Sequence, residues 1–457
     1  MLFNSYEFIL VYLPVTIIVF YLLGRYQNKQ WAVGWLVLIS FAFYGYWDVR
    51  YVPLLFCSIC FNYMVGKYLE KHTNRKTWLA FGIIVNILLL GYFKYTDFFL
   101  GTVNELVGES LFDLPHIVLP LGISFFTFTQ TAYLVDAYRG EARNRSFLTY
   151  CEFVTIFPHL IAGPIINHKK MIPQFVAEET FSLNYRNLAL GITIFAMGLA
   201  KKVLIADRIA PWVNEAFAHI DNLTFWQAWV GAISYTFQLY FDFSGYSEMA
   251  IGLGLMINLT LPLNFNSPYQ ANNIIDFWRR WHMTLGDWVK NYLYIPMGGN
   301  RYGELKKMRN LFVSMTIIGL WHGAGWTFVL WGALHGLYLM INHQWRRLRI
   351  EMPIILSRGL TFICVVIAWV FFRADSLADG INVLLCMTDW LGRGDMPAHD
   401  LGVLLLLGII LMIVPHPIKF LEQTSFPSVK WALVTIALLV EGILYITVES
   451  PFLYFQF

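Results

Sequence analysis

Two histidines, each beside tryptophan, are the residues of this 457-residue sequence best suited to chemistry. His282 ends the run Phe277–His282 (FWRRWH), and His322 lies forty positions later within Gly319–Trp326 (GLWHGAGW). Histidine changes its charge near neutral pH and can carry protons between reacting groups. Burying an ionisable side chain inside a membrane costs free energy, so such side chains usually face a cavity or a partner. The pair therefore predicts a buried proton-transfer site.

Each histidine also has a structural interpretation. His322 could be a residue that hydrogen-bonds between membrane helices, and His282 follows two arginines that could serve only as a topological anchor or a lipid-headgroup contact. We expect His322 to be catalytic, because imidazole is a costly choice for packing alone. As a pair, the two imidazoles could activate an acceptor hydroxyl and protonate or stabilise the leaving group.

Aromatic and basic neighbours predict the walls of this site. Indole rings can enclose a pocket, and the glycines of the second run allow other groups to approach closely. His335 lies 13 residues after His322 and could share its helix, so a direct role for it stays open. The residues that we assign to substrate binding are Trp278, Arg279, Arg280, Trp281, Trp321, Trp326 and His335.

Other chemistries find little support in the sequence. The segment Asp242–Glu248 offers serines, but it lacks the G-x-S-x-G elbow of a serine hydrolase. Cys57 and Cys60 have redox spacing within an apolar segment, where packing is the better interpretation. There is no H-E-x-x-H, Walker loop or zinc-ligand spacing, so we expect neither a metal nor a bound cofactor. His159, beside a proline in a broken apolar run, is expected to shape the structure.

Composition places the chain in a membrane. Of its residues 58% are hydrophobic and 13% are charged, whereas a soluble protein carries about 25% charged residues. The net charge of +3 is small, and the basic residues cluster in loops. Such clustering sets membrane topology and does not indicate nucleic-acid binding.

Apolar runs recur to the C-terminal region, and they predict an all-α polytopic membrane protein with roughly 9–12 transmembrane helices. They span residues 8–23, 31–47, 51–69, 78–95, 117–135, 188–200, 225–243, 311–320, 327–341, 360–372, 401–414 and 431–448. Basic loops alternate with acidic ones, which places the N-terminus outside and the basic loops in the cytoplasm. Lys201 and Lys202 fit this alternation poorly, whereas Arg143 and Arg145 fit it well.

Two regions do not read as plain membrane spans. Residues 153–166 are apolar but interrupted by proline and glycine, which predicts a re-entrant hairpin. Residues 244–310 are turn-rich, basic and aromatic, which indicates interfacial helices on the cytoplasmic side. We expect one membrane domain over residues 1–457, with N-terminal spans at 1–147, a catalytic core at 148–343 and C-terminal spans at 344–457.

Several longer motifs resemble the membrane-bound O-acyltransferase family, and specifically its bacterial branch similar to the membrane subunit of alginate O-acetylation. The segments that carry the resemblance are residues 119–125 (LPLGISF), 157–164 (FPHLIAGP), 240–254 (YFDFSGYSEMAIGLG), 277–282 (FWRRWH) and 320–323 (LWHG). The last hundred residues carry no matching signature. The resemblance implies a many-helix bundle around a central tunnel, with His322 as the catalytic histidine and His282 as the second polar residue.

The resemblance also implies a function and partners. Members of this branch move acyl groups to hydroxyls, commonly passing acetyl across the bacterial cytoplasmic (inner) membrane to an extracytoplasmic partner resembling SGNH hydrolases. We therefore expect a multi-pass O-acyltransferase that takes acetyl from a cytoplasmic thioester, acetyl-CoA, for O-acetylation of an exported polysaccharide such as alginate, cellulose or peptidoglycan. Membrane lipid surrounds it. The alternatives are D-alanyl transfer from a carrier protein to a cell-envelope polymer, and a non-catalytic lipid or polymer transporter.

Overall fold

The structure, a computed structural model, describes residues 1–26, 29–71, 74–142, 146–422, 424, 426–446 and 452–453. Within these ranges every regular element is a helix, which confirms the all-α prediction. Five helical stretches of the described chain are long and apolar enough to cross a membrane: Phe8–Arg25, Val49–Lys71, Arg75–Val107, Tyr185–Ala218 and Ile354–Arg373. The chain is thus a multi-pass membrane protein. Arg143 and Arg145, used above for topology, lie outside the described residues.

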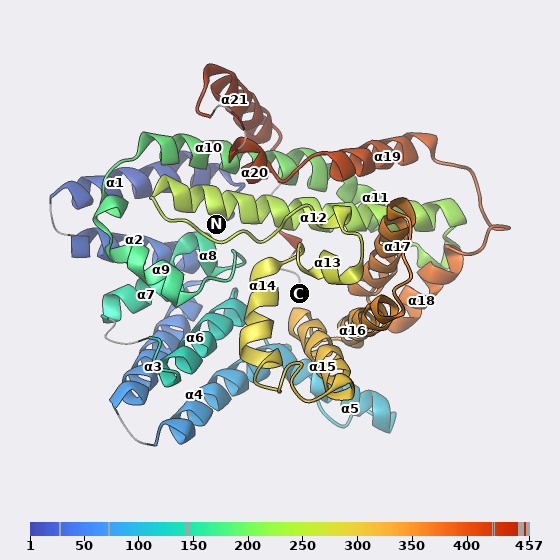
Figure 1. Ribbon diagram of the computed structural model, residues 1–457, viewed down its shortest axis with the longest axis horizontal. Helices are drawn as coiled ribbons and strands as arrows, with labels where there is room; N and C mark the ends of the chain where they lie inside the picture. Colours follow the sequence, from blue (N-terminus) through green and yellow to red (C-terminus); the bar gives the residue numbers. More distant parts are fainter. Residues whose placement is uncertain are drawn as a thin grey trace. The chain divides into compact units, whose positions relative to one another are not determined.

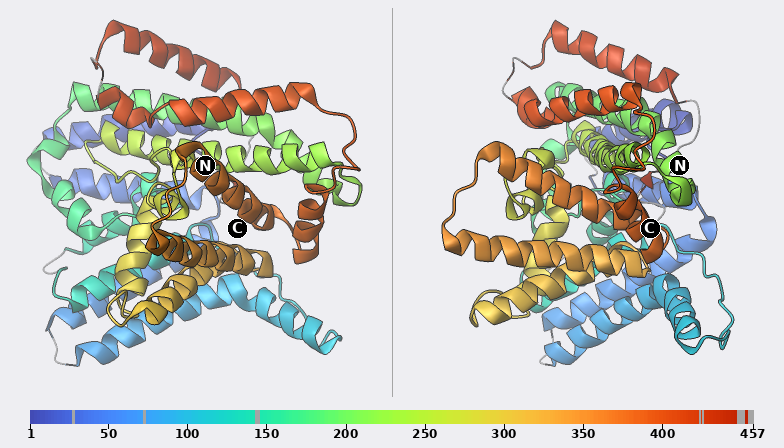
Figure 2. Two further views of the ribbon diagram at one scale, coloured as in Figure 1. Left: turned by 45° about the vertical axis from the view of Figure 1, so that its right-hand side comes forward. Right: turned by 90° about the vertical axis from the view of Figure 1, so that its right-hand side faces the viewer.

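The chain divides into two compact units, whose helices are drawn in Figure 1 and in two further views in Figure 2. Unit 1 comprises Met1–Ala196, Tyr246–Pro262 and Pro427–Pro451. Its helices are α1 (Leu13–Arg25), α2 (Lys29–Gly45), α3 (Val52–Lys71), α4 (Arg75–Leu90), α5 (Thr96–Val107), α6 (Ile123–Tyr138), α7 (Phe147–Thr155), α8 (Phe157–Leu160), α9 (His168–Val176) and α21 (Val429–Leu444).

Unit 2 comprises Met197–Gly245, Leu263–Phe426 and Phe452–Phe457. Its helices are α11 (Asp207–Ala218), α13 (Ile274–Trp278), α14 (Met283–Val289), α15 (Glu304–His322), α16 (Trp326–Leu348), α17 (Ile354–Arg373), α18 (Leu377–Cys386), α19 (Ala398–Ile413) and α20 (Pro417–Glu422). The sequence of α10 (Tyr185–Ala200) and that of α12 (Phe225–Met256) are each divided between the two units. The expected boundaries near residues 147 and 343 stay a prediction.

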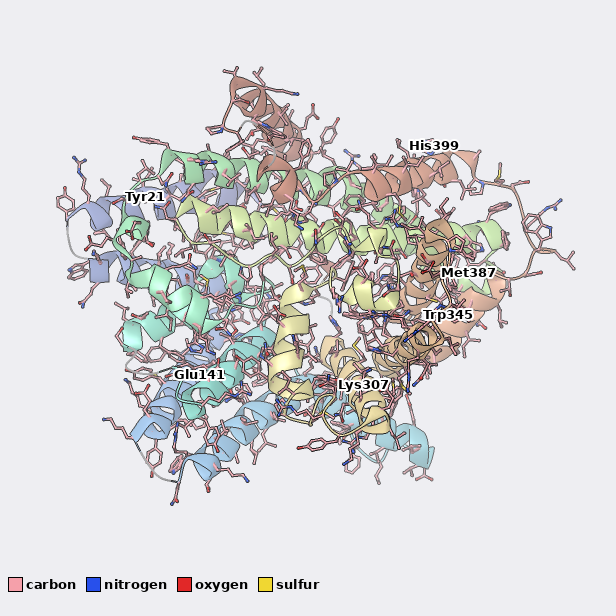
Figure 3. The ribbon with its side chains drawn as sticks, in the orientation of Figure 1. Tyr21, Glu141, Lys307, Trp345, Met387 and His399 are labelled. Atoms are coloured by element: carbon pink, nitrogen blue, oxygen red, sulfur yellow. The ribbon has the colours of Figure 1, made fainter. Side chains whose placement is uncertain are left out.

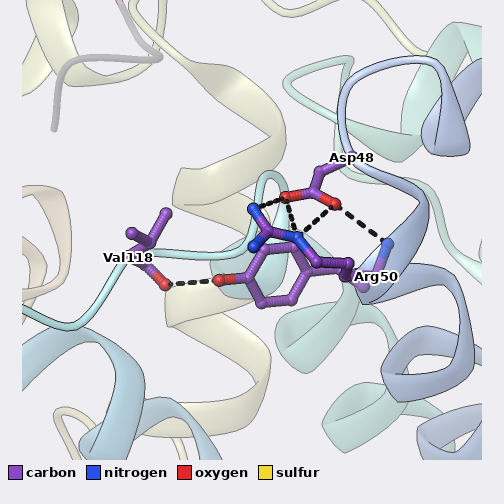
Figure 4. Close-up of polar contacts among 4 residues, drawn as sticks. Asp48, Arg50 and Val118 are labelled. Atoms are coloured by element: carbon purple, nitrogen blue, oxygen red, sulfur yellow. Dashed lines mark hydrogen bonds and ion pairs between the residues drawn. The ribbon is translucent and has the colours of Figure 1, made fainter.

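Polar side chains define how helices begin and pair in unit 1. The Asp48 carboxylate accepts a hydrogen bond from the backbone N–H of Arg50 and thereby caps the short turn before α3; it also pairs with the Arg50 guanidinium at 2.7 Å (Figure 4). The hydroxyl of Tyr51 donates to the carbonyl of Val118 at 3.2 Å. Deeper in the unit, the amides of Asn62 on α3 and Asn86 on α4 donate to each other at 3.2 and 2.7 Å. Reciprocal bonding satisfies two buried amides that would otherwise be costly in an apolar helix pair.

The interrupted segment at residues 153–166 forms two short helices, α7 and α8, followed by a turn. Both ring nitrogens of His159 are engaged: Nδ1 lies 2.9 Å from the carbonyl oxygen of Pro164, and Nε2 lies 3.1 Å from Oγ1 of Thr129 on α6. The ring is 1% exposed. These contacts hold the turn after α8, as expected for a histidine that shapes the structure.

Lys202 is not part of a loop, which corrects the interpretation that the apolar run near residue 200 ends there. The helix continues through Lys201–Ala206, a π-helical stretch, into α11. The ammonium of Lys202 is buried and contacts the carboxylates of Asp242 at 2.6 Å and Asp207 at 2.9 Å. A buried charge is tolerated when it is paired in this way, so a lysine pair that reads as a topological signal is in part an internal ion pair. The stretch between the apolar runs 78–95 and 117–135, expected as an acidic loop, likewise begins with the helix α5.

Glycines allow α15 and α16 to pack with their backbones in contact, and the two helices lie side by side in Figures 1 and 2. A Cβ added to Gly319 on α15 would lie 3.0 Å from Cα of Gly332 on α16. A Cβ on Gly332 would overlap the carbonyl oxygen of Met315, and one on Gly336 would lie 3.0 Å from Cα of Phe312. Small residues facing each other are a common basis of helix pairing in membranes.

This contact yields a stability prediction. We expect Gly332→Ala to lower the free energy of unfolding by about 1–3 kcal/mol, the usual cost of forcing an extra carbon into a packed interface. The measurement is thermal unfolding of the purified protein in detergent. The matched control is Gly359→Ala on α17, where an added Cβ meets nothing within 4 Å and the better helix propensity of alanine leaves the melting temperature unchanged or higher. Equal melting temperatures for both variants would contradict the close contact.

Candidate active site

His282 lies in unit 2 at the residue before α14, in a left-handed backbone conformation with φ 44°. A non-glycine residue in this region carries strain that the surrounding structure must compensate. Hydrogen bonds on both sides do so: the N–H of Met283 donates to the carbonyl of Asn264 at 2.8 Å, and the carbonyl of His282 accepts from Gly286 at 3.0 Å. The side chain is 0% exposed. The backbone thus directs this imidazole into the interior of the unit.

Asn264 determines the state of the His282 ring. Its side-chain oxygen Oδ1 lies 3.0 Å from Nδ1 of His282 and accepts from the hydroxyl of Thr284 at 2.8 Å. An amide oxygen can only accept, so the proton of the neutral ring resides on Nδ1 and the lone pair on Nε2. Burial lowers the pKa of His282, which lies outside the five candidate spans, to about 3. The ring is therefore neutral at neutral pH and carries an unprotonated nitrogen, Nε2.

His322 is the last residue of α15, and its ring lies next to that of His282. The ring centroids are 6.4 Å apart, and His322 is 5% exposed. The two histidines, forty positions apart in sequence, thus meet as the pair expected above. Two imidazoles at this separation can both contact one reacting group placed between them.

Aromatic rings enclose His322 on several sides. Its ring centroid lies 4.9 Å from that of Trp321, 5.1 Å from that of Trp331 and 5.3 Å from that of Phe372. Trp331 is fully buried and stacks on Trp369 at 5.3 Å. Such walls exclude water from the neighbourhood of the imidazole, and they come from α15, α16 and α17 together.

His335 lies on α16 as expected, but no direct contact joins it to either of the paired histidines among the described residues. The indole N–H of Trp278 donates to Nδ1 of His335 at 3.2 Å, so the ring's own proton resides on Nε2. Trp331 stands between the rings: its centroid is 5.0 Å from His335 and 5.1 Å from His322. Trp278 and His335 therefore form the layer behind Trp331.

The remaining predicted residues have different surroundings. Trp281 is buried, stacks on Phe277 at 5.6 Å and contacts Trp369 at 5.0 Å. The guanidinium of Arg280 pairs with Asp276 at 2.9 Å, one turn back along the chain. Arg279 is exposed. A role of these three side chains in binding substrate stays a prediction.

Trp326 is the predicted wall residue that the structure places least deeply. It is the first residue of α16 and is 48% exposed. Trp321, by contrast, is 5% exposed and lies 6.5 Å from His282 between ring centroids. Of the two tryptophans in residues 319–326, Trp321 lies at the histidine pair, and Trp326 lies nearer the surface.

Sequence reasoning missed several residues of the site. In the sequence, Asn264 is one polar residue of the turn-rich stretch 244–310, and nothing there indicates that it holds His282. The ring of Phe243, on α12, packs edge-on against the ring of His282, with the centroids 4.9 Å apart and an angle of 90° between the ring planes. Trp331 and Phe372 are apolar residues within long apolar helices, so their types carry no signal of a site. The signal that the sequence does offer is the four-residue spacing of Trp331 and His335, which places both side chains on one face of a helix.

Comparison with known proteins agrees with the geometry. The model of the MBOAT, membrane-bound O-acyltransferase family, matches residues 41–387, which include both histidines. The chain belongs to this family. It is accordingly an O-acyltransferase, as the resemblance of its motifs implied.

Named relatives lie within the same family. The chain is 48% identical to a peptidoglycan O-acetyltransferase of Helicobacter pylori over 84% of this chain and 79% of that protein. It is 41% identical to the "Probable alginate O-acetylase AlgI" of Pseudomonas aeruginosa over 90% of this chain and 81% of that protein. A teichoic acid D-alanyltransferase of Streptococcus thermophilus is 25% identical over 74% and 83% of the two chains. The O-acetyltransferases are therefore much more similar to this member of the family than the D-alanyltransferase is.

The hydrogen bond between Asn264 and His282 yields a second prediction. Asn264→Ala removes the acceptor that sets the tautomer of His282, and we expect acyl transfer to slow by about tenfold to a hundredfold, the equivalent of one lost strong hydrogen bond. The measurement is the acyl content of the modified product. Thr284→Val is the matched control, since it removes the hydroxyl bond to the same Oδ1 and keeps the bonds from His282 and from the backbone N–H of residue 284. If both variants lose activity equally, Asn264 acts on the fold and not on the ring.

Proposed function

We propose that this O-acyltransferase moves acetyl groups from a cytoplasmic thioester, acetyl-CoA, across the bacterial inner membrane for O-acetylation of an exported polysaccharide. The observation that carries the proposal is the buried pair His282 and His322, whose ring centroids are 6.4 Å apart inside an aromatic enclosure. Two relatives with high identity are named as a peptidoglycan and an alginate O-acetylating enzyme. A polysaccharide acceptor is the substrate that both names share.

The residues of the pair have distinct roles in this proposal. His322 is the general base that takes the proton of an acceptor hydroxyl as its oxygen attacks the thioester carbonyl. The new C–O bond forms, the C–S bond breaks, and the proton passes to the departing thiolate. His282, neutral with its lone pair on Nε2, orients the reacting group or shares the proton. General acid-base assistance of this kind contributes about 10²–10⁴-fold in rate.

The aromatic enclosure serves the same chemistry. A thioester that meets water in the site is lost to hydrolysis, and the rings of Trp321, Trp331 and Phe372 fill the space around His322 that water would otherwise occupy. The central tunnel implied by the family is the proposed path for the two substrates. Basic residues of the cytoplasmic face, among them the exposed Arg279, attract the phosphates of the donor.

An extracytoplasmic partner completes the proposal. We propose that an acetyltransferase resembling SGNH hydrolases receives the group on the outer side and modifies the polymer. A gene for such a partner or for a polymer synthase beside this one supports acetyl transfer to a glycan. Genes for an acyl-carrier protein and its ligase would support D-alanyl transfer, although the D-alanyltransferase relative is only 25% identical.

The experiment is mass spectrometry of the surface glycans of a deletion strain complemented with variant chains. We expect the wild type to restore O-acetyl groups. At equal protein level in the membrane, we expect His322→Ala to slow acyl transfer by about 10²–10⁴-fold and so to leave the glycans with far fewer O-acetyl groups. His399→Ala is the matched control, because this histidine is exposed and hydrogen-bonds only to its neighbour Asp400 among the described contacts.

Three outcomes would contradict the proposal. Unchanged modification with His322→Ala removes the catalytic role of this residue and leaves a transporter as the better function. D-alanyl esters on a cell-envelope polymer in place of acetyl would assign the chain to aminoacyl transfer. Loss of acetylation by His399→Ala alone would move the site away from the pair.

A further inference from the structure

One cavity of unit 2 is lined by neither histidine of the pair. It has a volume of about 490 Å³ and lies where the chain enters α13, beside the C-terminal half of α16 and the N-terminal half of α17. Its walls include Tyr338, Asn342 and Trp345 of α16 and Ser357 and Thr361 of α17. The volume falls in the range of sites that hold small organic ligands.

One side of the cavity is apolar and continues onto the lipid-facing surface. Ile341 and Leu360 line it and are 55% and 52% exposed, and Trp345, labelled in Figure 3, is 38% exposed. Ile355, in the first turn of α17, is 84% exposed. Because α17 is one of the candidate membrane spans, an acyl chain can lie along its exposed apolar side chains, Leu360 and Ile355.

The other side of the cavity is basic. Arg346 lines it, and Arg358 lies at its edge, where its Nε donates to Oδ1 of Asn272 at 2.8 Å. Lys307, labelled in Figure 3, pairs with Glu304 at 3.3 Å, so its charge is partly neutralised. An anion at this end of the cavity would therefore meet the guanidinium groups of Arg346 and Arg358.

Asn342 provides a polar anchor between the two sides. Its side-chain oxygen Oδ1 is buried and has no hydrogen-bond partner among the described residues. A buried acceptor without a donor is costly, and this one belongs to a residue that lines the cavity. A ligand whose hydroxyl or amine donor lies close to its anionic group would satisfy it.

We propose that this cavity binds an anionic phospholipid of the cytoplasmic leaflet, with its phosphate at Arg346 and Arg358, a headgroup hydroxyl donating to Asn342, and its acyl chain along α17. Basic pockets between membrane helices on the cytoplasmic side are sites where acidic headgroups bind. The basic end of α16, at Arg346, Arg347 and Arg349, belongs on that side by its charge. The site does not depend on acyl transfer.

The test measures lipid binding to the purified full-length protein. Native mass spectrometry and thermal unfolding in detergent are followed while phosphatidylglycerol, or phosphatidylcholine with the same acyl chains, is added. We expect phosphatidylglycerol to be retained and to raise the melting temperature, and phosphatidylcholine to bind about tenfold or more weakly, since its quaternary ammonium cancels the net negative charge that the arginines attract and its headgroup has no hydroxyl to donate to Asn342. Equal binding of the two lipids would overturn the proposal.

Two variants locate the site. Arg346→Gln is expected to weaken phosphatidylglycerol binding about tenfold, whereas Arg186→Gln, at an exposed arginine of α10, is the matched control and leaves binding unchanged. Asn342→Leu is expected to leave the lipid-free melting temperature equal or higher, because it removes a buried unsatisfied acceptor, and to reduce the shift caused by the lipid. A lower lipid-free melting temperature with an unchanged lipid shift would make Asn342 structural and overturn the assignment.

Soluble anions distinguish the lipid from other sources of phosphate. Excess inorganic phosphate and excess acetyl-CoA are each expected to leave the bound phosphatidylglycerol in place, since neither has an apolar tail for α17. Displacement by acetyl-CoA would make the cavity part of the donor's path and overturn the proposal. His322→Ala is expected to bind phosphatidylglycerol as the wild type does. Lipid binding is therefore tested independently of acyl transfer, and a wrong proposal about one leaves the test of the other valid.

Discussion

The close contact of α15 and α16 is the constraint on which the site depends. Gly319 and Gly332 bring the two backbones together, and only at that separation can Trp331 pack against His322 at the end of α15. A side chain at either glycine would push α16 outward and carry Trp331 and His335 with it. The aromatic enclosure of His322 thus depends on glycine, which has no side chain, at both positions.

The second histidine depends on a different kind of restraint. His282 occupies a left-handed conformation before α14, and Asn264 supports it through both a backbone carbonyl and a side-chain oxygen. One residue thereby sets the position of the imidazole and the nitrogen on which its proton resides. The hydrogen bond from Nδ1 and the left-handed backbone together explain how a buried imidazole is held neutral, in one tautomer and one orientation, in a largely apolar environment.

The sequence predicted the helical membrane architecture well, because a low content of charged residues and long apolar runs are what a helix needs to cross lipid. It also predicted that His282 and His322 meet, since two histidines with tryptophan neighbours are rare in such a chain. It failed at Lys202, where a charge that seemed to end a span is neutralised by Asp242 in the folded unit. It missed Asn264 because a hydrogen bond across 18 residues depends on tertiary structure, and a turn-forming asparagine gives no sign of it.

The central claim is that the two imidazoles act in one chemical step, and a double-mutant cycle tests it most directly. Acyl-transfer rates are measured for His282→Ala, His322→Ala and the variant with both changes, at equal amounts of folded protein. Residues that act as a unit are strongly non-additive, so the account predicts that the double variant is about as slow as His322→Ala alone. Multiplicative losses, as for two independent sites, would contradict it.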